Sequence, residues 1–313
     1  MRNRSFAMRL ALVAVLTIPL VSCSVFDRLR ALRVIKDAHT QYQRADYESA
    51  AELYEEVLAN DPNLVEAYFY LANSYDQQFR PALRGEPEND VMLERAIDTY
   101  ITSAERQNDL QLQTLSLQYL VAAYGPDKAN DPASSEPVLQ AMIQADSTNP
   151  ENYFALARLY EDSGLYEEAE GVLLEVADMS SEDPTVFLQL AGFYNRNEQF
   201  DLTIEALRRR AELEPDNPEA YYTISTYYWE KAFRDFRLDE EQEEEYVMLG
   251  LAEVEKALEL NADYVEALTY KNILMRMQAN LTDDLDERDA LIEEADILRD
   301  RAEELQAQRT GAS

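Results

Sequence analysis

Few side chains of this 313-residue sequence could carry out catalysis or bind a metal, because it has one cysteine, Cys23, and one histidine, His39. A metal site of paired histidines or a serine–histidine triad would depend on this single imidazole. We expect His39 to line a groove or to lie in solvent rather than to act in catalysis. The acidic run DEEQEEEY, which starts at Asp239, could hold a hard cation such as calcium through its carboxylates. It lacks the glycine of a defined calcium loop, so a solvated charge run is the favoured interpretation. No catalytic residue, metal site or cofactor is therefore predicted.

The position of Cys23 in the chain gives it a different role. It follows a basic start with three arginines and the eleven-residue apolar run LALVAVLTIPL, residues 10–20. This run is too short to span a bilayer, which takes about 20 apolar residues. A basic start, a short apolar run and small residues are typical of a secretory signal peptide that is removed. Residues 1–22 are therefore predicted to be a signal peptide, and the mature chain is predicted to begin at Cys23.

The sequence Leu20-Val21-Ser22-Cys23 resembles the bacterial lipobox. The resemblance implies cleavage before Cys23 and acylation of its sulfur, with residues 23–30 as a lipidated N-terminus and short basic linker. Ser24 after the cysteine favours the outer membrane, facing the periplasm. Two or more acyl chains hold a protein stably on a membrane without a spanning helix. The alternatives are an ordinary cleaved signal with a chance cysteine, or a buried free thiol.

The charge balance limits the partners. The chain has 28 lysines and arginines against 62 aspartates and glutamates, and 25 of the basic residues remain when the three arginines of the leader are removed. Nucleic-acid binding rests on a basic surface that releases counterions, so no nucleic-acid partner is expected. The acidic body favours a basic partner segment. The one basic stretch, residues 24–36, could lie on anionic lipid headgroups or be a solvated helix face.

A repeat of 34 residues runs through the centre of the chain. Apolar residues within each segment recur at helical spacing, and a polar turn with a breaker divides the segment into two helices. A fixed period of this length marks an architecture of stacked units, each of which buries its apolar face against its neighbours. The repeated positions are Pro150, Pro184 and Pro218; Leu156, Leu190 and Ile224; and Tyr160, Tyr194 and Tyr228.

This pattern of Leu, a small residue and Tyr on a first helix, with a proline near the end of the unit, resembles the tetratricopeptide repeat (TPR). The resemblance implies an all-α fold, a right-handed α-solenoid of stacked helix-turn-helix repeats with a C-terminal capping helix. About six units are expected in residues 31–264. Residues 265–306 are expected to form a final helix pair that caps the stack, and residues 307–313 a disordered tail.

Three parts of the repeat region depart from the pattern. Inserts are predicted near residues 80–92 and 234–247, because the spacing between the two helices of those units is too long. The unit over residues 109–149 matches least well, and its stretch NDPASSEP is predicted to be part of a longer turn.

The TPR resemblance also implies a concave groove lined by certain positions of each first helix. Rigid aromatic side chains beside hydrogen-bonding groups suit peptide recognition. The alternative is that these are scattered exposed aromatics without a ligand. The residues expected to line the groove are Phe69, Asn73, Phe154, Arg158, Leu188, Tyr222, Thr226 and Trp229.

These features favour a non-enzymatic, membrane-anchored TPR scaffold that binds a partner protein or peptide in the bacterial cell envelope, in assembly or secretion. An accessory protein that binds or organises an envelope polysaccharide or peptidoglycan is the alternative. A hydrolase with an unrecognised site is a third interpretation, and the unbroken repeat argues against it.

Overall fold

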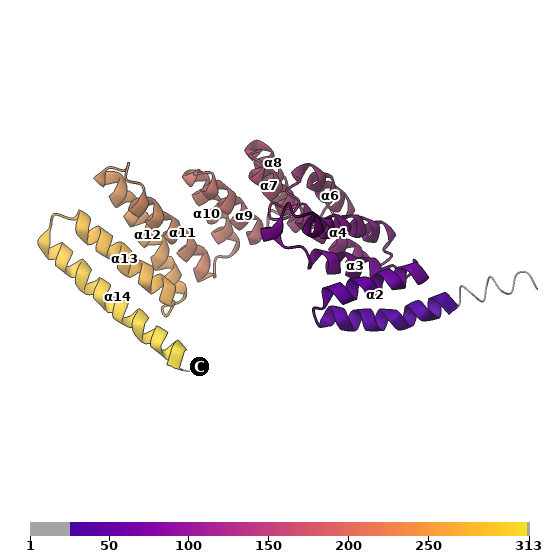
Figure 1. The fold of residues 1–313 in the computed structure, drawn as a ribbon. Helices are drawn as coiled ribbons and strands as arrows, with labels where there is room; N and C mark the ends of the chain where they lie inside the picture. The colour runs from indigo at the N-terminus through magenta and orange to yellow at the C-terminus, as the bar shows by residue number, and fades with distance from the viewer. Residues whose placement is uncertain (1–25, 312–313) are drawn as a thin grey trace, which may run out of the picture. The chain divides into compact units, whose positions relative to one another are not determined.

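The computed structural model describes residues 26–311 (Figure 1). Every regular element in this range is a helix, and no strand occurs in it. The chain divides after Leu165 into two compact units. The predicted all-α fold of helix pairs is confirmed.

The first unit begins with a helix over residues 26–43. Within this unit, each α-helix packs against the α-helix that follows it in the chain. The further elements are α2 (Tyr47–Asn60), α3 (Glu66–Asp76), the short 3-10 helix η1 (Pro81–Leu83), α4 (Pro87–Arg106), α5 (Leu110–Tyr124), α6 (Pro132–Ala145) and α7 (Pro150–Asp162).

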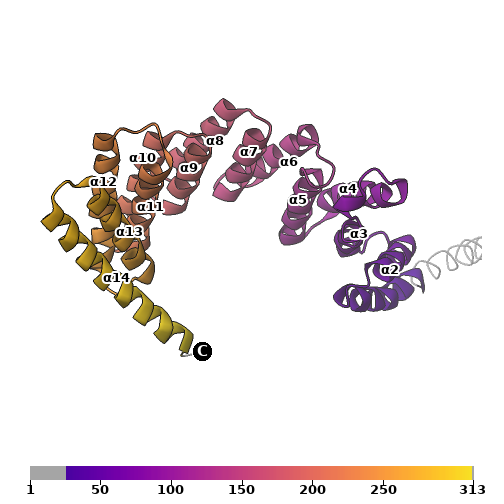
Figure 2. The same ribbon diagram turned by 60° about the vertical axis from the view of Figure 1, so that its left-hand side comes forward.

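The second unit holds three helix pairs, α9 with α10, α11 with α12 and α13 with α14, after the single helix α8. The two helices of a pair lie side by side in both views (Figure 2). The elements are α8 (Tyr166–Met179), α9 (Pro184–Arg196), α10 (Phe200–Leu213), α11 (Pro218–Arg234), α12 (Glu240–Leu260), α13 (Val265–Leu281) and α14 (Leu285–Gly311).

Each of the three repeated prolines is the first residue of a helix, where its missing N–H costs no intrahelical bond. The residue before each proline is Asn149, Asp183 or Asn217. Its side chain accepts a hydrogen bond from the backbone N–H two residues on, at 3.1, 2.9 and 3.0 Å. Such a cap is worth about 1 kcal/mol of stability. The 34-residue period therefore sets where helices begin as well as which residues are buried.

The two predicted inserts are short loops followed by extra turns of helix. In the first, residues 80–86, which include η1, lie outside α4. The Asn89 side chain accepts a hydrogen bond from the Arg80 backbone N–H at 2.8 Å and donates one to the Arg80 carbonyl at 3.2 Å. In the second, residues 235–239 alone separate α11 from α12. Asp239 caps α12 in a capping box with Gln242. The acids that follow lie in the first turn of α12, where negative charge offsets the helix dipole.

Three boundaries differ from the sequence-based expectation. Residues 26–30 are helical rather than a linker, and α14 continues to Gly311, so residues 307–311 are helical rather than disordered. The stretch NDPASSEP is not a long turn, because Pro132 begins α6 and Asp131 caps it. A cluster of proline, serine and aspartate can start a helix as well as form a turn.

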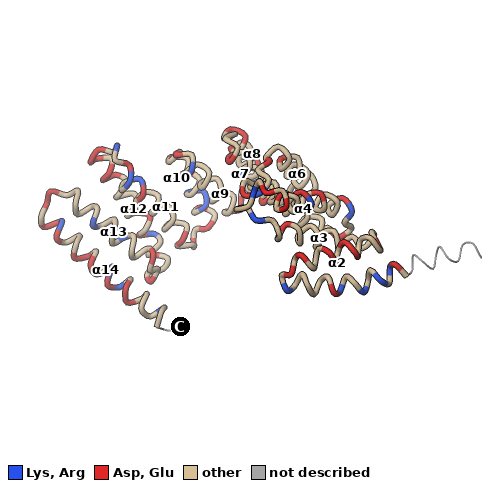
Figure 3. Tube along the Cα trace, in the orientation of Figure 1, with Lys and Arg blue, Asp and Glu red and all other residues tan. Residues whose placement is uncertain are grey.

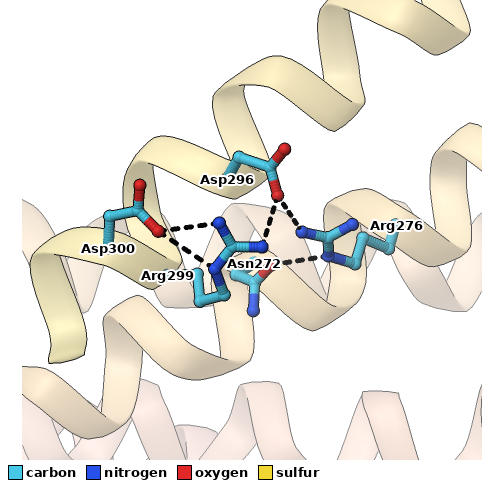
Figure 4. A network of polar contacts seen from close by, with 5 residues as sticks. All are labelled: Asn272, Arg276, Asp296, Arg299 and Asp300. Atoms are coloured by element: carbon cyan, nitrogen blue, oxygen red, sulfur yellow. Dashed lines mark hydrogen bonds and ion pairs between the residues drawn. The ribbon is translucent and has the colours of Figure 1, made fainter.

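The last helix is held to its partner by a polar network (Figure 4). Asp296 of α14 accepts from Arg276 of α13 at 2.5 Å and from Arg299 at 2.7 Å. Arg299 also binds Asp300 at 2.7 Å. The Arg276 guanidinium, together with Arg299, holds the pKa of the Asp296 carboxyl below its usual range.

None of the helices in residues 26–311 combines the length and the apolar composition needed to cross a membrane. The predicted anchor, Cys23, lies outside the described residues.

Candidate functional site

Two of the predicted groove residues of the first unit are buried in its core. Phe69 is 7% exposed and Asn73 is 3% exposed. The Asn73 amide accepts a hydrogen bond from the Tyr42 hydroxyl at 2.7 Å and donates one to the Tyr100 hydroxyl at 3.1 Å. The prediction of open groove positions is therefore wrong for these two residues, because tyrosines from neighbouring helices fill the space over them.

The last residue of α3, Asp76, is also closed off from solvent. Asp76 is buried and forms an ion pair with Lys128 of the loop between α5 and α6, with 2.5 Å between Nζ and Oδ1. The same loop accepts a hydrogen bond from Arg84 of the first insert through the Pro126 carbonyl, at 2.6 Å. Insert and loop together cover this part of the first unit.

His39, the only histidine, also lies against this tyrosine core. Its Nδ1 is 2.6 Å from the hydroxyl of the buried Tyr54, and its ring contacts Tyr70 edge-on at 4.8 Å. A structural contact with Tyr54 therefore explains its position on the first helix. Within residues 26–311, no three histidine, cysteine, aspartate or glutamate side chains gather closely enough to hold a metal ion.

Two predicted groove residues lie on α7 at the surface of the first unit. Phe154 is half-buried and Arg158 is exposed. Arg158 forms an ion pair with Asp162 one helical turn on, at 3.1 Å. In the second unit, Leu188 on α9 is 38% exposed. These three residues remain available for contact with a partner.

The remaining predicted residues, Tyr222, Thr226 and Trp229, lie half-buried on α11. Tyr222 and Trp229 both contact Tyr270 of α13 edge-on, with ring centroids 5.4 and 5.3 Å apart. Trp229 also stacks on Phe233 at 5.4 Å, with the two planes within 9°. Thr226 donates to a backbone carbonyl of its own helix at 2.7 Å. The aromatic residues thus stabilise the packing of α11 on α13.

An open hollow of about 420 Å³ lies beside this aromatic cluster, between α13 and α14. Tyr222 and Tyr270 line one side, and Arg299 and Gln306 of α14 line the other. Burial, together with the neighbouring tyrosines, raises the pKa of Tyr222 to about 12. Of the predicted groove residues, only Tyr222 lines this hollow.

A larger hollow, which the sequence did not predict, lies over α10 and α12 of the second unit. Its volume is about 860 Å³, and we call it the α10–α12 hollow. Three of its aromatic rings form one cluster, with centroids 5.4 to 6.2 Å apart. Leucines at its edges, Leu174 and Leu202, are 46% and 38% exposed. Its main apolar side chains are Phe187, Leu190, Tyr194, Phe200, Leu202, Tyr228, Tyr246 and Leu249.

The charges around the α10–α12 hollow are mainly negative. Its two arginines are already bound: Arg208 donates to the Tyr228 hydroxyl at 3.0 Å, and Arg209 pairs with Glu212 at 3.0 Å. Three exposed acids also line it, and none of them forms an ion pair with a described residue. They are Asp201, Glu205 and Glu245. The arrangement can therefore accept apolar side chains in the centre and cations at the edge.

The second insert forms a further hollow of about 580 Å³ next to Phe200. Asp235 of the insert accepts from Arg237 at 2.6 Å and from Lys231 at 2.9 Å. These bonds hold the pKa of the Asp235 carboxyl well below its usual range. The insert presents Phe236, which is 94% exposed.

The comparisons with known proteins agree with this architecture. Residues 128–190 match the family model described as tetratricopeptide repeat. No significant relative was found among curated proteins. The structure resembles the C-terminal part of a TPR repeat-containing protein from Cytophaga hutchinsonii, with 16% identity, a TM-score of 0.55, and coverage of 86% of this chain and 98% of that one. It also resembles MamA from Desulfovibrio magneticus RS-1, with 13% identity, a TM-score of 0.42, and coverage of 63% and 97%. The fold is a TPR fold.

The TPR signature tyrosines share one contact. Three of them donate a hydrogen bond from the hydroxyl to a glutamate of the preceding helix pair: Tyr75 to Glu55, Tyr160 to Glu136 at 2.9 Å, and Tyr194 to Glu170 at 2.9 Å. The fourth, Tyr228, instead accepts from Arg208, which lines the α10–α12 hollow. Tyr228 at the α10–α12 hollow therefore contacts an arginine where the other three tyrosines contact a glutamate.

Proposed function

We propose that this protein is a non-enzymatic TPR scaffold that binds a segment of a partner protein in the α10–α12 hollow. The proposal includes a lipid anchor at Cys23 and a place in the bacterial cell envelope, at the outer membrane and facing the periplasm. The observation that carries it is the hollow itself: an aromatic and aliphatic centre with unpaired acids at its edge.

The open shape of the hollow, rather than its volume, suits a segment of protein. Pockets that enclose a ligand of drug size have volumes of about 300–1,000 Å³. The α10–α12 hollow, at about 860 Å³, lies in this range but is open to solvent along α10 and α12. A helix of about 10–12 Å diameter could place two or three side chains in it, as amphipathic helices do in apolar grooves.

The lining determines the chemistry of the segment. Leu202 and Tyr246 favour apolar partner residues, while Glu205 and Glu245 favour lysine or arginine beside them. An amphipathic basic segment is the partner that satisfies both. The acidic charge of the whole chain would also speed its association, an effect that salt reduces.

A non-enzymatic role is consistent with the side chains available. His39 contacts Tyr54, and the acidic run at Asp239 begins a helix. Within residues 26–311, neither belongs to a group of side chains that could hold a metal ion.

Site-specific photo-crosslinking tests the proposal. A photoreactive amino acid replaces Leu202, which lines the hollow, and a control chain carries it at Ile297 of α14, which is 63% exposed. We expect irradiation of intact cell envelopes to link position 202, and not position 297, to a protein segment with apolar residues at helical spacing and basic residues beside them. Equal products at both positions would contradict the proposal, and a product with a glycan at position 202 would favour the polysaccharide alternative.

A further inference from the structure

The outer face of the helix over residues 26–43 carries apolar side chains that no other described residue covers. Its inner face packs on the core through Ala31, Ile35 and Ala38, which are at most 6% exposed. On the outside, Phe26 is 75% exposed and Leu29 is 61% exposed. Phe26 and Leu29 lie within one helical turn of each other, so their exposed side chains form a compact apolar patch.

Basic side chains continue the patch along the same helix. Figure 3 shows Lys and Arg at several places along this helix, which also holds two acids, Asp27 and Asp37. Arg28 pairs with Asp61, the residue that ends α2, at 3.8 Å, and Arg30 pairs with Glu56 of α2 at 2.6 Å. Arg33 and Lys36 are exposed, and no acidic side chain of the described residues forms an ion pair with them.

The spacing places the apolar and the basic residues on one stripe. Phe26, Leu29, Arg33 and Lys36 follow each other at intervals of three, four and three residues, which is one face of an α-helix. The stripe is about 15 Å long at 1.5 Å per residue. Its apolar end is the one nearer to Cys23, and its basic end lies further along the helix.

We propose that this stripe, Phe26, Leu29, Arg33 and Lys36, lies on the surface of an anionic bilayer, with the rings and aliphatic groups among the headgroups and the cations on the lipid phosphates. The inference deepens the proposed lipid anchor and rests on it for the location of the chain.

Three observations select the bilayer as the occupant. Cys23 lies three residues before Phe26, so the two are at most about 10 Å apart along the chain, which keeps the stripe within reach of an acylated sulfur. Cations near an anionic surface each contribute about 1 kcal/mol, and apolar groups add to this. The rest of the chain is strongly acidic, so the same surface repels it. The stripe is therefore the part of the protein that an anionic bilayer attracts.

The test uses the chain from Ser24 onward, which holds every described residue and cannot be acylated at Cys23. It is mixed with vesicles of phosphatidylcholine and phosphatidylglycerol, or of phosphatidylcholine alone, and bound protein is separated by flotation. We expect binding only to the anionic vesicles, and less of it as salt is raised. Arg33→Gln with Lys36→Gln removes two cations, so we expect about a tenfold loss or more in partition.

Matched variants control for exposure and folding. Phe26→Ser with Leu29→Ser should also reduce partition, whereas Leu285→Ser with Arg234→Gln, at residues 65% and 68% exposed elsewhere, should not. Circular dichroism confirms that each variant stays folded. Equal binding to both kinds of vesicle, no binding, equal loss in the control pair, or self-association without lipid would each overturn the inference. Because this chain lacks Cys23, failure here leaves the acylation of Cys23 to its own test.

Discussion

The buried ion pair between Asp76 and Lys128 provides a direct test of how the first unit is closed. The Asp76 side chain is 2% exposed, that of Lys128 is 24% exposed, and Lys128 is its one charged partner among the described residues. Lys128→Met keeps most of the aliphatic chain but leaves the carboxylate without its cation. Removing one partner of a buried pair costs about 3–5 kcal/mol, and we expect about 3 kcal/mol because water reaches the lysine.

Thermal and urea unfolding followed by circular dichroism measures this loss for Lys128→Met. Asp76→Asn combined with Lys128→Met removes both charges and should recover most of the stability. An exposed pair provides the control: Arg301→Met breaks contacts with Asp263 and Glu304 and should cost far less than Lys128→Met, because water screens these charges. If Lys128→Met is as stable as the wild type, or if the double variant is no better than the single one, the reasoning is wrong.

Further predictions concern the anchor, the packing of α12 and the tyrosines. Cys23→Ala should abolish acylation, seen as loss of a labelled fatty acid and release from membranes, and a variant that stays tightly bound without acylation would contradict the anchor. Gly250→Leu should lower the melting temperature, because a Cβ there would lie 3.2 Å from Leu274 and 3.4 Å from Tyr228, and an unchanged melting temperature would contradict this packing. Burial raises the pKa of three tyrosines to about 12, above their value of about 10 in the unfolded chain. Their contribution to the free energy of unfolding is therefore full below pH 10 and is lost as the pH rises toward 12. These tyrosines are Tyr42, Tyr75 and Tyr222. Part of the tyrosine absorbance change should then accompany the loss of helix content as the pH rises toward 12, and ionisation of all 20 tyrosines near pH 10 with unchanged helix content would contradict it.

The fold could be predicted from the sequence because its signals are local. The prolines at 150, 184 and 218 follow a capping residue and precede an apolar face of helical spacing, so each segment specifies its own helix start and its own core. The same local rules explain the errors. Proline and serine near residue 132 and acids near residue 240 resemble loops, yet both stretches begin helices with an aspartate cap.

The candidate site could not be predicted in the same way, because it depends on contacts between neighbouring helix pairs. Asn73 occupies a groove position by its place on α3, but Tyr42 and Tyr100 from two other helices cover it. The α10–α12 hollow depends on how far apart neighbouring helix pairs lie, which a 34-residue pattern does not encode. The contact of Arg208 with Tyr228 beside the hollow likewise depends on how two helices pack, so it is seen only in the structure.

Binding of the crosslinked partner segment, made as a synthetic peptide, tests the central claim most directly. Its affinity is measured by titration for the wild type, for Glu205→Lys with Glu245→Lys in the hollow, and for Glu259→Lys with Glu293→Lys, two exposed acids that do not line it. We predict that the hollow pair binds at least about tenfold more weakly, a loss of about 1.4 kcal/mol or more, while the control pair, with the same change in net charge, stays within about twofold of the wild type. Equal affinity for the wild type and the hollow pair, with both proteins folded, would contradict a partner site in the α10–α12 hollow.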